Sequence, residues 1–167
     1  MSVPNKKLLV IYHSHTGGTE QMVRAFSEAA DLEPGVEVIC RHATQTEAHD
    51  VLTADGLVFA TPENLASMSG LLKDFFDRTY YQVLDRINGR PYCILICAGS
   101  DGTGAARQIE RIATGWRLNL IQPALIINTG AQTPEAILAP KKLSQEQLKQ
   151  CSDFGALFAA GLAMAVF

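Results

Sequence analysis

Short apolar runs alternate along this chain with segments whose apolar residues recur at helical spacing. Most of the runs are almost continuously apolar, which is typical of parallel strands covered on both faces. The run at Val36–Arg41 instead alternates with polar residues and suits a strand at the edge of a sheet. The pattern predicts five strands: Lys7–Tyr12, Val36–Arg41, Gly56–Ala60, Tyr92–Ala98 and Pro123–Asn128. It predicts helices at Thr19–Ala30, near Gln45–Leu52, and at Met68–Gln82, Thr103–Trp116 and Ser144–Val166.

The alternation of strands and helices predicts an α/β fold in which right-handed crossovers build a doubly wound parallel sheet. No linker, repeat or low-complexity tract interrupts the pattern, so residues 1–167 are expected to form a single domain. Ligands of such sheets bind beyond the carboxyl ends of the strands, where the winding reverses. The loops that follow the strands are therefore where functional residues are expected.

The composition predicts a sizeable hydrophobic core, because 47% of the 167 residues are hydrophobic and 19% are charged. The formal net charge is -3 and no basic stripe stands out, so we expect no nucleic acid partner and no anionic lipid surface. The apolar stretch Phe154–Phe167 is shorter than the ~20 residues of a spanning helix. No secretion signal is recognised near the N-terminus. We therefore expect no membrane span and a cytoplasmic location.

The cysteines and histidines show no metal-ligand spacing, so no metal site is predicted. The four cysteines lie far apart or inside apolar runs, and a chain of this size does not need disulfides. We expect all four to be reduced, small core residues: Cys40, Cys93, Cys97 and Cys151.

The most informative segment is the loop after the first predicted strand, Ser14-His15-Thr16-Gly17-Gly18-Thr19. Its hydroxyl groups and backbone N–H groups lie where a helix begins, and the N-terminus of a helix favours an anion. The loop holds no Lys or Arg, so a phosphate in it would be held by neutral donors. The absence of a basic residue leaves few known classes of phosphate-binding loop that this segment could match.

Several known anion loops are excluded. The P-loop of nucleoside triphosphatases needs Gly-Lys-Ser/Thr, which does not occur in this sequence. The Rossmann fingerprint needs Gly-x-Gly-x-x-Gly after the first strand, where only Gly17-Gly18 is found. A cysteine phosphatase needs an Arg six residues after its Cys, and no cysteine has one. A phospho-receiver domain needs an Asp closing the third strand, where Ala60-Thr61 stands instead.

Ser14, Thr16, Gly17 and Thr19 satisfy the pattern Ser/Thr-x-Thr-Gly-x-Thr, which resembles the phosphate loop of the flavodoxin superfamily. The resemblance covers the whole chain. It implies a flavodoxin-like three-layer sandwich whose five parallel strands, numbered in chain order, are arranged 2-1-3-4-5 with helices on both faces. It also implies FMN as the cofactor, with its phosphate held by Ser14, His15, Thr16, Gly17, Gly18 and Thr19.

Two further loops are where this superfamily holds the isoalloxazine ring of FMN. The segment Thr61–Met68 is similar to the ring loop of the NAD(P)H:quinone reductase branch, Thr-Pro-x-x-aromatic-Gly-x-Met. Leu65 departs from the aromatic position of that pattern and Ala66 from its glycine. The resemblance implies ring contacts from Thr61, Pro62, Glu63, Asn64, Leu65 and Ala66, and from Ala98, Gly99, Ser100, Asp101 and Gly102.

The third loop bears on the activity. Electron-carrying flavodoxins usually place a Tyr there against the ring, and no aromatic residue lies between Ala98 and Arg107. Small residues in the second loop also leave room for a flat substrate. The resemblance therefore implies an FMN-dependent oxidoreductase, with NAD(P)H as the possible donor and a quinone, a flavin or another small molecule as acceptor. Because the flavin carries the chemistry, no catalytic side chain is expected.

Two other functions stay open. One is a flavodoxin-type electron carrier without substrate chemistry of its own, and the other is a non-catalytic regulatory module that keeps the fold. A homodimer or homotetramer is a further alternative, because a second subunit could complete the pocket. The apolar C-terminal stretch would then supply surface for that partner.

Overall fold

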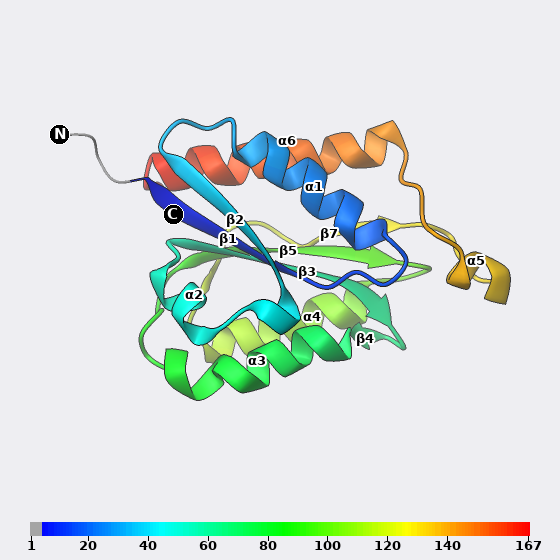
Figure 1. Cartoon of the computed structure of the whole chain (residues 1–167), viewed down its shortest axis with the longest axis horizontal. Coiled ribbons are helices and arrows are strands. Elements are labelled where there is room, and N and C mark those ends of the chain that lie inside the picture. Colours follow the sequence, from blue (N-terminus) through cyan, green and yellow to red (C-terminus); the bar gives the residue numbers. More distant parts are fainter. Residues whose placement is uncertain (1–4) are drawn as a thin grey trace.

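A central parallel sheet organises the computed structural model, which describes residues 5–167 (Figure 1). Its main strands are β1 (Lys6–Tyr12), β2 (Val36–His42), β3 (Gly56–Asn64), β5 (Pro91–Ala98) and β7 (Leu125–Asn128). They lie in the order β2-β1-β3-β5-β7, which confirms the predicted arrangement. The prediction of five strands missed two strands of two residues each, β4 (Ser67–Met68) and β6 (Asn119–Leu120).

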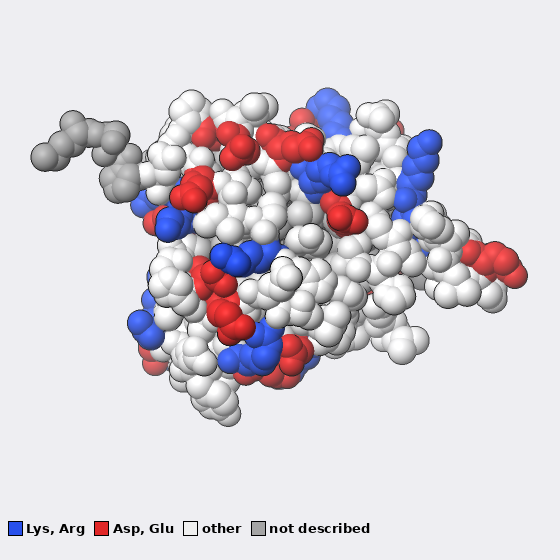
Figure 2. Space-filling view, in the orientation of Figure 1, with Lys and Arg blue, Asp and Glu red and all other residues white. Residues whose placement is uncertain are grey.

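Helices cover both faces of the sheet, as predicted (Figure 1). On one face lie α1 (Gly18–Ala30) and α6 (Gln145–Ala163), and on the other lie α2 (Ala48–Thr53), α3 (Gly70–Val83) and α4 (Thr103–Gly115). Two short pieces complete the fold, the 3-10 turn η1 (Ala43–Gln45) and α5 (Pro134–Leu138). Acidic and basic side chains are interspersed on the face that Figure 2 shows.

The two faces of the sheet bury separate hydrophobic clusters. Leu8 and Val10 of β1 point toward α1 and α6, where they join Phe26 and Phe158. Leu9 of β1 points to the other face, into the cluster under α3 and α4. This separation follows from the alternation of side chains along a strand. The edge strand β2 is only partly buried, in agreement with its alternating sequence.

The largest differences between the predicted and observed elements lie in the β3–β4 region and at α5. Strand β3 continues past Ala60 to Asn64, because its end pairs antiparallel with β4 in a hairpin. Met68, predicted to begin a helix, belongs to that hairpin. Helix α5 was not predicted, since none of its residues is buried and it has no apolar periodicity to reveal it.

The prediction that all four cysteines lie in the core is wrong for Cys40, which is exposed on the edge strand β2. The other three cysteines are buried. Within residues 5–167 there is no group of His, Cys, Asp and Glu arranged to hold a metal ion. No helix in the same range is long and apolar enough to cross a membrane.

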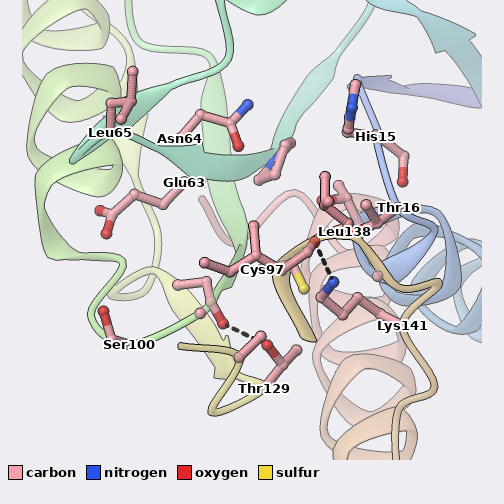
Figure 3. Close-up of a pocket in the computed structure, with 18 of the residues that line it drawn as sticks. His15, Thr16, Glu63, Asn64, Leu65, Cys97, Ser100, Thr129, Leu138 and Lys141 are labelled. Carbon is pink, nitrogen blue, oxygen red and sulfur yellow. Dashed lines mark hydrogen bonds between the residues drawn. The ribbon is translucent and has the colours of Figure 1, made fainter. Parts of the chain in front are cut away.

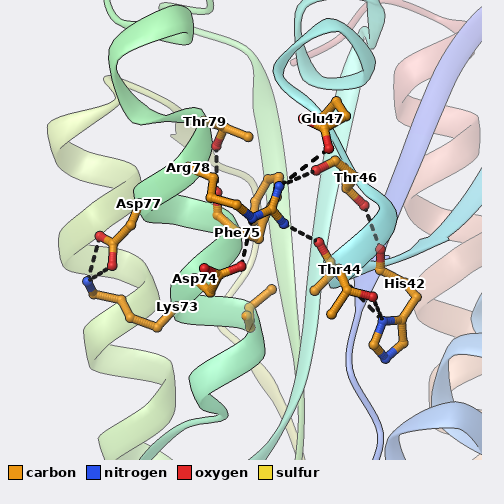
Figure 4. A network of polar contacts seen from close by, with 12 residues as sticks. His42, Thr44, Thr46, Glu47, Lys73, Asp74, Phe75, Asp77, Arg78 and Thr79 are labelled. Carbon is orange, nitrogen blue, oxygen red and sulfur yellow. Dashed lines mark hydrogen bonds and ion pairs between the residues drawn. The ribbon is translucent and has the colours of Figure 1, made fainter.

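A polar clamp joins α3 to the segment after β2 (Figure 4). The guanidinium of Arg78 donates to the carbonyl oxygens of Ala43 at 2.8 Å and Thr46 at 3.2 Å. Its Nε pairs with Asp74 at 2.7 Å, and Glu47 lies 3.6 Å from Nη1. The clamp fixes this connection at the carboxyl edge of the sheet. It also gives hydrogen-bond donors to backbone carbonyl oxygens that would otherwise need water.

Candidate functional site

A pocket of about 540 Å³ opens at the carboxyl edge of the sheet (Figure 3). Four segments surround it: the β1–α1 loop, the β3–β4 hairpin, the β5–α4 loop, and the segment between β7 and α6. Its volume lies in the range of small-molecule sites, roughly 300–1,000 Å³. The edge is also where a doubly wound sheet binds ligands.

The structure brings the three loops singled out in the sequence to this one pocket. Most of the predicted site residues line it: Ser14, His15, Thr16, Gly18, Thr19, Pro62, Glu63, Asn64, Leu65, Ala66, Ala98, Gly99 and Ser100. Segments far apart in sequence therefore form a single surface, as a shared ligand requires.

Four predicted residues are not among those that line the pocket. Gly17 and Gly102 precede α1 and α4 with φ of 89° and 98°, a left-handed backbone that glycine adopts without strain. The Thr61 hydroxyl accepts from the backbone N–H of Ser69 at 3.0 Å. The Asp101 carboxylate accepts from the Thr103 hydroxyl at 2.9 Å. In this structure these residues shape the loops that line the pocket.

The start of α1 holds an unpaired polar group. Thr19 is 2% exposed, and its hydroxyl has no hydrogen-bond partner among residues 5–167. A buried hydroxyl without a partner costs about 1–3 kcal/mol. Because Thr19 lines the pocket at the N-terminus of a helix, a bound anion would supply the missing partner. The donors at this end of the pocket fit the phosphate of FMN.

The β3–β4 hairpin turns through two residues with left-handed backbone, Leu65 at φ 52° and Ala66 at φ 60°. Such a two-residue turn normally uses Asn and Gly, because side chains of other residues are strained there. The Leu65 side chain is fully exposed at 101% of its reference area. A Cβ on Gly104 would collide with the carbonyl oxygen of Ala66, so α4 packs backbone to backbone against the turn.

Glu63 ties the hairpin to α4. Its carboxylate accepts from the backbone N–H groups of Gly102 at 2.8 Å and Ala105 at 3.0 Å. A negative charge at the N-terminus of a helix is stabilised by the helix dipole. The same interaction holds the second and third predicted loops in fixed relation to one another.

Sequence reasoning missed one wall of the pocket. This wall comes from the segment after β7 and contributes Thr129, Ala131, Ile137, Leu138 and Lys141, while Cys97 at the end of β5 was also missed. Lys141 is the only lysine or arginine lining the pocket in the described part of the chain. Its backbone N–H donates to the carbonyl oxygen of Thr16 at 2.8 Å. Its ammonium donates to carbonyl oxygens at the end of α5, including that of Ile137 at 2.9 Å, and Figure 3 marks a hydrogen bond from Lys141.

No sequence signal marked this wall, because its residues show no periodicity and no loop motif. Cys97 could have been found, since it lies at the carboxyl end of a predicted strand, one residue before the loop already singled out. Lys141 could be found only from the fold.

Histidines surround the end of β1. His15 is exposed and lines the pocket, whereas His13 is buried and its Nδ1 has no partner among residues 5–167. The ring centroid of His13 lies 5.5 Å from that of His42 and 6.4 Å from that of His15. Burial lowers the pKa of His13, and the two neighbouring histidines lower it further. The group next to the β1–α1 loop is therefore a neutral imidazole at neutral pH.

The family model described as "NADPH-dependent FMN reductase" matches residues 42–132, just over half of the chain. This stretch includes the hairpin and the β5–α4 loop but not the β1–α1 loop. A "Flavodoxin" of Aquifex aeolicus is 36% identical over 98 residues, which cover 59% of this chain and 53% of that protein.

An "NAD(P)H dehydrogenase (quinone)" of Acidithiobacillus ferrooxidans is 33% identical over 93 residues, 44% of this chain and 46% of that protein. The chain thus spans about half the length of the curated relatives that it matches. Among solved structures, a flavodoxin from the domain Archaea superposes with a TM-score of 0.77 at 18% identity, covering 93% of this chain and 98% of the other. That likeness supports the flavodoxin-like fold.

Proposed function

This chain belongs to the NADPH-dependent FMN reductase family, and we propose that it binds FMN in the pocket and passes electrons from NAD(P)H to a small acceptor such as a quinone or a flavin. The observation that carries the proposal is the buried hydroxyl of Thr19, which has no partner in residues 5–167 and belongs to a residue that lines the pocket where α1 begins. An apolar substrate would leave this hydroxyl unsatisfied, whereas a phosphate accepts its hydrogen bond.

The β1–α1 loop would hold the phosphate. Ser14, Thr16 and Thr19 bring hydroxyl groups to the pocket, and the dipole of α1 favours the negative charge. Lys141 adds a nearby positive charge, although its ammonium is occupied by α5 carbonyl oxygens. Binding therefore depends mainly on neutral donors, as the loop composition predicts.

The hairpin and the β5–α4 loop would hold the ring. When bound, FMN supplies the hydride and electron transfer chemistry. The chain contributes the position of the ring, through backbone held by the Glu63 bonds to Gly102 and Ala105. A fixed backbone binds a planar ring without ordering loops at the moment of binding.

The pocket lining favours an enzyme over an electron carrier. No Phe, Tyr or Trp is among the lining residues in the described range 5–167. Aliphatic and small residues at the hairpin, Leu65 and Ala66, leave space for a nicotinamide or a quinone to stack against the ring. A specific observation favours the second candidate, an electron carrier: one of the matched relatives is named a flavodoxin.

One experiment separates the candidates. Purified protein is freed of cofactor, titrated with FMN by fluorescence, and then mixed with NADPH or NADH in the presence and absence of a quinone. A reductase oxidises the pyridine nucleotide in a quinone-dependent manner. A carrier binds FMN but leaves the pyridine nucleotide unchanged. Protein that takes up no FMN would contradict both candidates.

A further inference from the structure

Residues 129–143, here called the strap, cross the pocket between β7 and α6. The strap contributes one wall of the pocket and includes α5, which projects from the body of the molecule (Figures 1 and 2). Helix α5 buries none of its residues. Its pocket-lining side chains remain open to solvent, with Ile137 51% and Leu138 76% exposed. Packing alone therefore does not hold this part of the strap in place.

The strap is anchored at its two ends. At the first end, the backbone N–H of Thr129 donates to the carbonyl oxygen of Ala98 at 2.9 Å. At the second end, the backbone N–H of Lys141 donates to Thr16, and Leu143 is buried in the core. The ammonium of Lys141 binds carbonyl oxygens at the end of α5, so these bonds lie within the strap and do not attach it to the rest of the molecule.

Gln21 of α1 connects the second end to the phosphate loop. Its Nε2 donates to the carbonyl oxygens of Gly17 and Lys141, both at 2.8 Å. Its Oε1 accepts from the backbone N–H of Leu143 at 3.1 Å. The nitrogen and the oxygen of one side-chain amide thus join the start of α1 to the end of the strap, more than a hundred residues away in the chain. Gln21 itself does not line the pocket.

We infer that Gln21 is a positioning residue: it holds the strap against the phosphate loop and so sets the affinity for the phosphate of the cofactor, without contacting the cofactor. This inference rests on the proposed function. A wall that is already fixed costs nothing to order when the ligand binds, whereas a loose wall must be ordered at that moment. The Gly17 carbonyl, which Gln21 also fixes, belongs to the loop that would hold the phosphate.

The test compares Gln21→Met, which keeps the side-chain length and removes the amide, with the wild type. In the cofactor-free protein, backbone amides of residues 129–143 should exchange with solvent faster. The dissociation constant for FMN should rise about ten-fold. Riboflavin, which lacks the phosphate, should lose less affinity. Gln21→Glu keeps an acceptor for Leu143 but loses both donors, so it should weaken FMN binding at least as much.

Gln82→Met is the matched control, because it makes the same exchange at an exposed position of α3. It should change neither amide exchange in the strap nor FMN affinity. Unchanged strap exchange in Gln21→Met, or equal losses for FMN and riboflavin, would overturn the inference. Wild-type protein that fails to bind FMN would instead overturn the proposed function, and the amide exchange would still decide whether Gln21 holds the strap.

Discussion

The pocket and the Arg78 clamp lie at the same edge of the sheet but are built in opposite ways (Figures 3 and 4). In the clamp, the guanidinium is surrounded by backbone carbonyl oxygens and the carboxylate of Asp74. In the pocket, the Thr19 hydroxyl is unpaired within residues 5–167, and Leu65 and Ala66 have strained backbone. The polar groups of the clamp are paired without a ligand. The unpaired hydroxyl and the strained backbone of the pocket cost free energy, which a bound ligand can offset.

The largest expected effect is on the clamp. Arg78→Met should lower the free energy of unfolding by about 2–3 kcal/mol, because the carbonyl oxygens of Ala43 and Thr46 lose a charged donor. For a chain of this length the melting temperature should fall by roughly 4–12 °C. Urea denaturation followed by circular dichroism measures the change.

Arg86→Met is the control, since Arg86 is exposed and, within residues 5–167, its guanidinium donates only to the carbonyl oxygen of Gln82, at 3.3 Å. Its effect should stay within about 0.5 kcal/mol. If both variants lost the same stability, the clamp would not be the feature that stabilises this edge.

The next effect is on the pocket, where one substitution should act in opposite directions on stability and binding. Thr19→Val removes the unpaired hydroxyl while keeping the shape, so cofactor-free protein should gain up to about 1 kcal/mol. The same variant should bind FMN about ten- to a hundred-fold more weakly, because the phosphate loses a hydrogen-bond donor. Denaturation and fluorescence titration report the two quantities.

Thr114→Val makes the same exchange on α4, where the hydroxyl already donates to the carbonyl oxygen of Glu110 at 2.8 Å. It should leave FMN affinity unchanged. Wild-type affinity in Thr19→Val would remove this hydroxyl from the phosphate site.

A smaller effect is expected at the hairpin. Ala66→Gly should raise the free energy of unfolding by about 0.5–1 kcal/mol, because glycine adopts φ 60° without strain. Ala29→Gly, in the regular backbone of α1, should lower it by about 1 kcal/mol. Thermal unfolding of the two variants tests the contrast. A loss of stability in both would mean that the turn is not strained.

The smallest effect concerns pH. Burial lowers the pKa of His13 in the folded protein below its unfolded value of 6.5. Between these two pKa values the unfolded chain binds more protons than the folded protein. The contribution of neutral His13 to the free energy of unfolding is therefore fully present above pH 6.5 and decreases as the pH falls below it. His13→Leu should flatten this part of the pH profile of unfolding. His49→Leu, at an exposed position of α2, should keep the wild-type profile.

Much of the fold could be predicted because its signals are local. The apolar runs identified the main strands within one to four residues at their ends, and the alternation at Val36–Arg41 identified the edge strand. The hydroxyl and glycine residues of 14–19 marked a loop that lines the pocket from its own composition. Hairpin strand β4 and helix α5 were missed, because elements of two and five residues are too short to show periodicity.

The sequence by itself determined the layered fold and the positions of three pocket loops, since periodicity and turn chemistry act over a few residues, whereas the strand order came from the resemblance to a known superfamily. Only the tertiary structure decided which distant groups complete the site. Lys141 reaches the β1–α1 loop, Gln21 binds the strap, and Glu63 reaches α4 through contacts between segments far apart in the chain. Such contacts depend on how the layers pack, which no short stretch of residues specifies.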